Sequence, residues 1–102
     1  MQTYFNTQIV ACREREAVLT ADGREDEAVF EKVRANVYGI FQTVWTLNKG
    51  MEFFREKLET IPQNWQAARE KAEKHGDTAA VTLETIKLET AQEILEHWEA
   101  VR

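Results

Sequence analysis

One amphipathic stretch constrains the fold of this chain more than any other feature of its sequence. It runs from residue 26 to residue 49 and reads DEAVFEKVRANVYGIFQTVWTLNK. Its apolar residues recur at spacings of three and four, which places them on one broad side of a helix: Phe30, Val33, Val37, Ile40, Phe41, Val44 and Trp45. A helix with so wide an apolar side must pack against other elements, so we expect the remaining chain to supply them.

Three further stretches carry the same helical pattern. Residues 3–21, 51–75 and 78–101 are rich in good helix formers and repeat apolar residues at spacings of three and four. The turns between the stretches contain glycine, which is common just past the end of a helix: Gly23, Gly50 and Gly76. Because these turns are short, consecutive helices are expected to pack as antiparallel neighbours.

The third stretch contains the only proline, Pro62. Proline lacks a backbone donor and its ring collides with the preceding turn, so we expect two pieces, 51–61 and 62–75, of one bent arm. The prediction is an all-α fold, an antiparallel bundle of four helical segments with the third bent or broken at Pro62, in a single domain of residues 1–102. The alternative is three long helices plus a short one that packs across the end or helps to build a dimer.

The distribution of charge argues against direct binding of nucleic acid. The chain has 13 basic and 18 acidic residues, a net charge of −5, and the acidic surplus lies in residues 77–102. Neutralising phosphates needs clustered Lys and Arg, and no such cluster is present. No apolar run approaches the ~20 residues of a membrane span, and residues 1–20 lack the pattern of a secretion signal. The sequence predicts an acidic, cytoplasmic protein that does not contact membranes.

Residues that could carry chemistry are few. Glu93 and His97 are four positions apart and could hold a metal weakly, but neither His75 nor His97 follows a glutamate by three, as di-iron bundles require. Cys12 lies on the apolar stripe of its helix, so a core thiol is favoured over a nucleophile. The sequence has no phosphate-binding loop and no nucleophile elbow. We therefore expect no enzymatic activity, no cofactor and no metal.

Two charged residues lie inside or beside apolar stripes. They are Glu16 in the first helical stretch and Arg34 in the second. A buried charge needs a partner, so a structural ion pair between Glu16 and Arg34 is a prediction.

The central stretch also has a second face, which is made of small residues. Gly39 in mid-helix costs about 1 kcal/mol relative to Ala, and small side chains let another helix approach closely. Either a helix of the same chain packs there, or a partner protein or a second copy does. Tyr38 and Trp45 lie at the edge of the main apolar stripe, and both residue types are enriched at interfaces. The candidate interaction face consists of Ala28, Ala35, Tyr38, Gly39, Trp45 and Thr46.

These expectations lead to one function and two alternatives. The leading hypothesis is a non-enzymatic helical interaction module, which binds another protein or itself as a homodimer. Its acidic last helix suits a basic partner, in a contact that weakens with salt. The first alternative is a regulator that acts through a nucleic-acid-binding partner. The second is a small-ligand-binding bundle with a pocket near Trp65 and Trp98.

Overall fold

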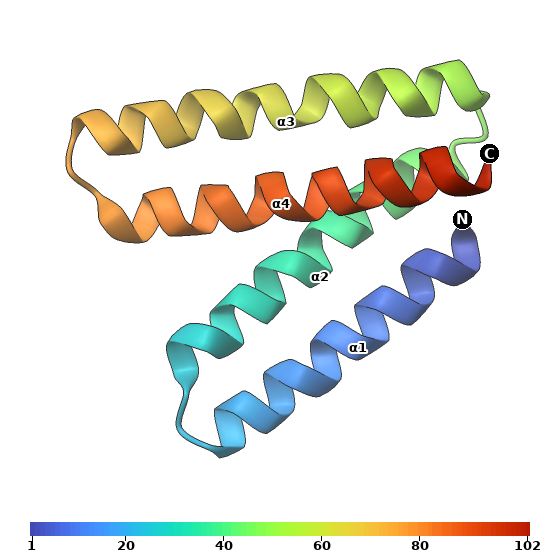
Figure 1. Cartoon of the computed structure of the whole chain (residues 1–102). Helices are drawn as coiled ribbons and strands as arrows, with labels where there is room; N and C mark the ends of the chain where they lie inside the picture. Colours follow the sequence, from blue (N-terminus) through green and yellow to red (C-terminus); the bar gives the residue numbers. More distant parts are fainter.

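The computed structural model describes residues 1–102 and contains four long helices and no strand. They are α1 (Gln2–Ala21), α2 (Glu25–Thr46), α3 (Met51–Lys74) and α4 (Thr78–Val101). The prediction of an all-α bundle of four helical segments is therefore confirmed, and the alternative with one short helix is not seen (Figure 1).

The helices pair as two antiparallel hairpins, α1 with α2 and α3 with α4 (Figure 1). The hairpins meet at the end of the molecule where both chain termini lie, and they diverge towards their turns. The Cα atoms of α1 come within 8 Å of α2 but of neither α3 nor α4. Helix α2 is therefore the helix of the first hairpin whose backbone lies against the second hairpin. This position between α1 and the second hairpin agrees with a sequence that has one apolar face and one small-residue face.

The turn between α3 and α4 follows its sequence signals. Gly76 has a φ angle of +68°, in the left-handed region that glycine adopts without steric cost. The carboxylate of Asp77 accepts a hydrogen bond from the backbone N–H of Ala80 at 3.1 Å. Asp77 thus satisfies one of the free donors at the start of α4, which is why the helix begins at the next residue.

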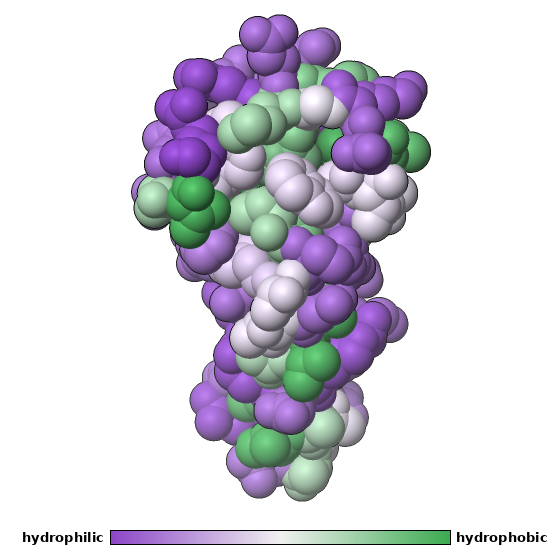
Figure 2. Space-filling model, turned by 90° about the vertical axis from the view of Figure 1, so that its right-hand side faces the viewer, coloured by the Kyte–Doolittle hydropathy of each residue, from purple (hydrophilic) through white to green (hydrophobic).

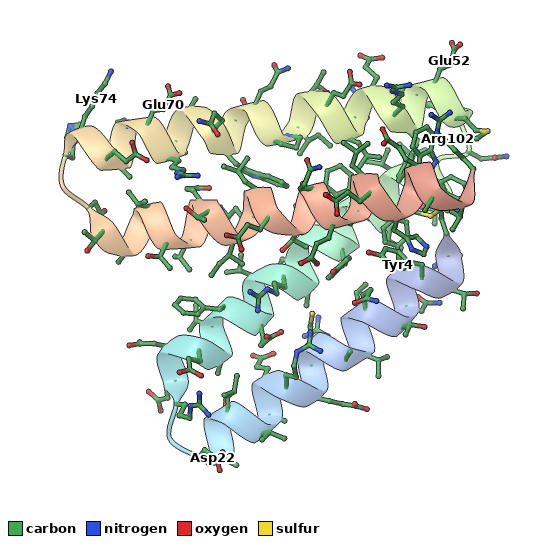
Figure 3. The ribbon with its side chains drawn as sticks, in the orientation of Figure 1. Tyr4, Asp22, Glu52, Glu70, Lys74 and Arg102 are labelled. Carbon is green, nitrogen blue, oxygen red and sulfur yellow. The ribbon has the colours of Figure 1, made fainter.

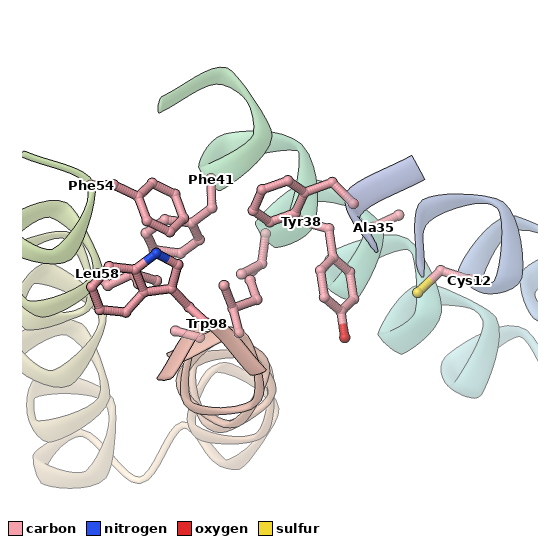
Figure 4. Packing of buried hydrophobic residues seen from close by; sticks show 11 residues of the cluster. Cys12, Ala35, Tyr38, Phe41, Phe54, Leu58 and Trp98 are labelled. Atoms are coloured by element: carbon pink, nitrogen blue, oxygen red, sulfur yellow. The ribbon is translucent and has the colours of Figure 1, made fainter. Parts of the chain in front are cut away.

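Phe54 of α3 is the centre of the hydrophobic core and is 1% exposed. Its ring contacts one aromatic residue from each other helix. The centroid distances are 6.3 Å to Phe5 of α1, 5.2 Å to Trp45 of α2 and 6.0 Å to Trp98 of α4. Figure 4 shows Phe54 and Trp98 side by side in this cluster. Because aromatic side chains bury so much area each, this junction dominates the packing between the hairpins.

Pro62 does not break α3, so of the bend or break predicted there the break is wrong. The helix runs continuously from Met51 to Lys74 and is drawn as one ribbon (Figure 1). A proline in the helix interior removes one backbone hydrogen bond. Packing on both sides of it offsets that loss, since Phe54 and Leu58 are buried before Pro62 and Ala72 is buried after it.

The diverging hairpins leave the molecule more open than most chains of its length. Its radius of gyration is 14.5 Å, against about 12.8 Å for an average domain of 102 residues. Its accessible surface is 6427 Å², against about 5,950 Å² for an average monomer of its mass. In Figure 2 the end of the α1/α2 hairpin forms the narrow lower part of the molecule. None of the four helices combines the length and hydrophobicity needed to cross a membrane.

Candidate interaction surface

The small-residue face predicted on α2 is largely used within the chain. Ala28, Ala35 and Tyr38 are buried, whereas Gly39 and Trp45 are half-buried and Thr46 is exposed. Figure 4 places Ala35 of α2 on the side that faces Cys12 of α1. Three of the six predicted residues therefore pack inside the chain, and the other three are partly or fully exposed.

Gly39 does not mark a close approach between helices of this chain. A Cβ atom added at Gly39 would meet no atom within 4 Å. Together with Ile9, Arg13 and Ile40, among others, it lines a shallow groove between α1 and α2. The small residue of α2 that faces α1 is thus Ala35 (Figure 4), and the space beside Gly39 stays open.

A buried glutamate that the sequence reasoning missed, Glu31, joins α1 to α2. Its Oε1 atom accepts a hydrogen bond from Nη1 of Arg34 at 2.8 Å, and its Oε2 atom forms an ion pair with Nε of Arg15 at 3.1 Å. The predicted pair of Glu16 with Arg34 is not formed. Arg34 binds the acid one turn earlier on its own helix, and α1 contributes a cation rather than an acid. The spacing of three between Glu31 and Arg34 is the sequence signal for this pair.

Cys12 lies in the same interface and is fully buried. The Nη2 atom of Arg15 donates a hydrogen bond to its Sγ atom at 3.4 Å. Burial raises the pKa of the Cys12 thiol; the positive charge of Arg15 opposes this rise, and Glu31 adds to it. A protonated and inaccessible thiol is a packing group, because nucleophilic attack requires an exposed thiolate.

A second polar cluster joins the two hairpins, and one of its residues, Tyr4 of α1, is labelled in Figure 3. The hydroxyl of Tyr38 donates a hydrogen bond to Oε2 of Glu93 at 3.1 Å. The rings of Tyr4 and His97 stack with centroids 3.8 Å apart. Burial raises the pKa of both tyrosines, and the charge of Glu93 adds to the rise. Glu93 and His97, weighed above as weak metal ligands, thus contact tyrosines, and no three or more His, Cys, Asp or Glu residues are grouped to hold a metal.

Both tryptophans expected near a ligand pocket pack against aromatic residues of the chain. Trp98 is 3% exposed and contacts Phe54. Trp65 is half-buried and meets the ring of Phe41 edge-on, with centroids 6.3 Å apart. Their contacts stabilise the junction of the hairpins.

Several large hydrophobic side chains remain at the surface. Their exposed fractions lie between 39% and 61%, and the residues are Val10, Val18, Val29, Ile40, Leu47, Met51 and Val101. Contiguous apolar surface is where soluble proteins bind one another, whereas isolated apolar residues are ordinary. Only exposed apolar residues that lie next to one another can therefore form a binding surface.

Leu47 and Met51 belong to the connection from α2 to α3 and Val101 is the last residue of α4, and Figure 1 draws this connection and the C-terminus at the same end of the molecule. We call this the end surface. Beside it is a partly open cavity of about 110 Å³. The cavity is lined by Val44, Trp45, Asn48, Lys49, Gly50, Met51 and Phe54.

Comparison with known proteins gives no family: no family model matches the chain, and no match is found among curated proteins or solved structures.

Proposed function

We propose that this protein is a non-enzymatic interaction module that acts by binding another protein chain. The proposal rests on a difference between the polar clusters of the protein, whose groups contact one another, and its large hydrophobic residues, some of which stay exposed. The buried and half-buried ionisable groups of both clusters are engaged with one another across helix interfaces. Seven large hydrophobic residues remain exposed, and apolar surface gains free energy when a partner covers it.

The shape of the molecule supports the same proposal. Two hairpins joined at one end present more surface than an average monomer of this mass, and much of it comes from helix faces. Helix faces bind partner helices through apolar residues at spacings of three and four. Helix α4 adds an acidic outer side with Glu89, Glu96 and Glu99, which suits a basic partner and a contact that weakens with salt.

The test is quantitative copurification of the tagged protein from cells that naturally contain this sequence. Three variants with polar surface are compared with the wild type. They are Val10→Gln/Val18→Gln on α1, Val29→Gln/Ile40→Gln on α2, and Leu47→Gln/Met51→Gln at the end surface. All replaced residues are exposed, so we expect each variant to keep its helical content.

We expect one variant to lose a protein that the wild type and the other two variants retain. The proposal is overturned if no protein, including an untagged copy of this chain, is enriched reproducibly. Enrichment that is equal for the wild type and all three variants also contradicts it, because binding would then not depend on the exposed apolar residues.

A further inference from the structure

The connection from α2 to α3, residues 47–50, is the only covalent link between the two hairpins, and few hydrogen bonds hold it. In the turns inside the hairpins, the backbone N–H groups of Arg24 and Asp77 bond back to the preceding helix, with N–O distances of 2.8 Å and 2.9 Å. In the connection the last such donor is Asn48, and no backbone N–H group of residues 49–53 donates to a backbone carbonyl or to a capping side chain. Fewer backbone donors are therefore bonded in the connection than in either hairpin turn.

Packing does not hold the connection either. Residues 46–51 are all exposed, and the partly open cavity of about 110 Å³ is lined in part by residues 48–51. Gly50 has a φ angle of +97°, and Asn48, with a φ angle of +54°, is the one residue other than glycine whose φ is positive. Left-handed backbone is unfavourable for a residue with a side chain. The connection is thus a short exposed segment, beside a cavity, whose backbone is less favourable than that of a helix.

The apolar pattern of α2 continues into α3 in the same register. The apolar residues alternate at spacings of three and four without interruption, and they are Phe30, Val33, Val37, Ile40, Val44, Leu47, Met51, Phe54, Leu58, Ile61, Trp65, Ala68 and Ala72. Two separate helices do not need a common register, whereas an unbroken repeat of this length is typical of one long helix that pairs with another. Leu47 and Met51, which are 51% and 53% exposed, are the members of this repeat at the connection. A helix that continued through the connection would bring them into line with the buried Phe54.

We propose that α2 and α3 join into one helix through the connection, and that two chains in this open form exchange hairpins to make a domain-swapped dimer. The α3/α4 hairpin of one copy then packs on the α1/α2 hairpin of the other. The contacts of Phe54 with Phe5 and Trp45, and of Tyr38 with Glu93, form between the copies instead of within one. This inference goes beyond the proposed function, because it uses contacts inside the closed chain rather than its exposed surface.

The open form gains backbone hydrogen bonds and loses packing between the hairpins. A continuous helix gives each N–H group of residues 49–53 a carbonyl four residues earlier, and it removes both positive φ angles. Against it stand the low helix propensity of Gly50 and the separation of the aromatic cluster around Phe54. A second copy restores that cluster, so the swapped dimer has the packing of the closed chain together with the additional backbone bonds. Its population therefore rises with protein concentration.

The first experiment measures molar mass by light scattering after refolding from urea, over a hundredfold range of protein concentration. The wild type is expected to form a two-chain species as the concentration rises. Gly50→Ala is expected to lower the dissociation constant about tenfold, because alanine opposes the positive φ of the closed form and favours the helix of the open form. Asn48→Gly has both effects reversed and is expected to raise the dissociation constant about tenfold.

The matched control is Gly76→Ala, the same substitution at a glycine of positive φ in the turn inside the α3/α4 hairpin. It strains this turn equally in the closed chain and in the dimer, so the dissociation constant is expected to stay unchanged. A wild type and a Gly50→Ala variant that both stay monomeric overturn the inference and leave the proposed function to the copurification test. A dimer that Gly50→Ala and Asn48→Gly leave unchanged also overturns it, because the connection is then not the hinge.

The second experiment identifies which chain supplies each hairpin. In a Cys12→Ala background, one chain carries Tyr4→Cys and the other carries His97→Cys, at positions whose side chains stack in the closed form with ring centroids 3.8 Å apart. The two chains are refolded together at high concentration and treated with a short bis-maleimide. A link between them is expected, because positions 4 and 97 of different chains meet only after exchange.

The control pair is Asn6→Cys on one chain and Gln42→Cys on the other, in the same background. These side chains hydrogen-bond within the α1/α2 hairpin at 2.6 Å. Exchange of whole hairpins keeps this contact inside each chain, so no link is expected. A dimer without a link between the Tyr4→Cys and His97→Cys chains overturns the exchange. Equal linking of both pairs overturns it too, since the chains then associate without exchanging hairpins.

Discussion

The hydroxyl group of Tyr38 donates a hydrogen bond to Oε2 of Glu93 at 3.1 Å and so joins α2 to α4. Tyr38 and Tyr4 are the only tyrosines in the chain, and both have a pKa raised mainly by burial. In an unfolded chain tyrosine ionises near pH 10. Above that pH the unfolded chain therefore loses protons that the folded chain keeps, and the free energy of unfolding falls as pH rises.

We expect Tyr38→Phe to make this loss of stability less steep, since phenylalanine cannot ionise. The measurement is urea unfolding of the wild type and the variant between about pH 8 and about pH 11. Lysines and arginines titrate equally in both proteins, so the difference between the two slopes reports Tyr38. The tyrosinate absorbance of the folded wild type should appear well above pH 10; a midpoint at the ordinary pKa would contradict the burial of both rings.

Phe54→Ala is expected to be the most destabilising single truncation in the core. It removes a ring that contacts aromatic residues of all three other helices, and such truncations cost about 3–5 kcal/mol. Chemical unfolding measures the change. The control is Phe53→Ala, which removes a half-exposed ring next to Lys49 and Lys57 and should cost about 1 kcal/mol or less. Equal losses for the two variants would show that Phe54 is not the centre of the junction.

Glu31→Gln tests the ion pairs between α1 and α2. The amide keeps the shape of the side chain but loses the charge that Arg15 and Arg34 both contact. We expect a loss of about 1–3 kcal/mol in the free energy of unfolding, the usual range when a buried polar contact is broken. Glu27→Gln breaks an exposed pair with Arg24 and should cost about 0.5 kcal/mol or less. This prediction fails if the two substitutions have the same effect.

Cys12 is expected to react with a thiol reagent only when the α1/α2 interface opens. In the native protein near neutral pH the reaction should be slow, and in urea it should be complete at once. The control is Cys12→Ala/Ala17→Cys, which moves the thiol to an exposed position of the same helix. That variant should react without urea. Equally fast reaction of native Cys12 would rule out its burial.

Pro62→Ala is expected to stabilise the protein. It restores the backbone donor missing inside α3 and removes the clash with the preceding turn, worth about 1–3 kcal/mol after the greater freedom of the unfolded chain is counted. A higher midpoint of urea unfolding with an unchanged slope would confirm it. A lower midpoint would mean that the proline ring, which is half-buried, contributes packing that alanine cannot replace.

The helix boundaries were predictable because the signals that set them are local. Gly76 and Asp77 define the turn before α4 through one backbone angle and one hydrogen bond within three residues. The apolar stripe of α2 correctly predicts that Val37 and Phe41 are buried. Such features depend on a few neighbouring positions, and a single sequence contains them.

The errors concern contacts between distant residues. The continuity of α3 through Pro62 depends on packing from other helices, which a local rule for proline does not include. The choice of Glu31 rather than Glu16 as the buried acid depends on which side of α1 faces α2. For the same reason, the predicted interaction face on α2 gave no indication that Leu47 and Met51 would be exposed together.

The pairing of the helices as two hairpins also has a consequence for the order of folding. Each pair of partners is adjacent in sequence and separated by three residues, so its contacts close short loops at little cost in chain entropy. Assembly of each hairpin thus needs no information from the other half of the chain. The contacts that require both halves are the aromatic cluster around Phe54 and the polar contacts of Tyr38 with Glu93 and of Tyr4 with His97, so the cooperativity of folding rests on the encounter of the two hairpins.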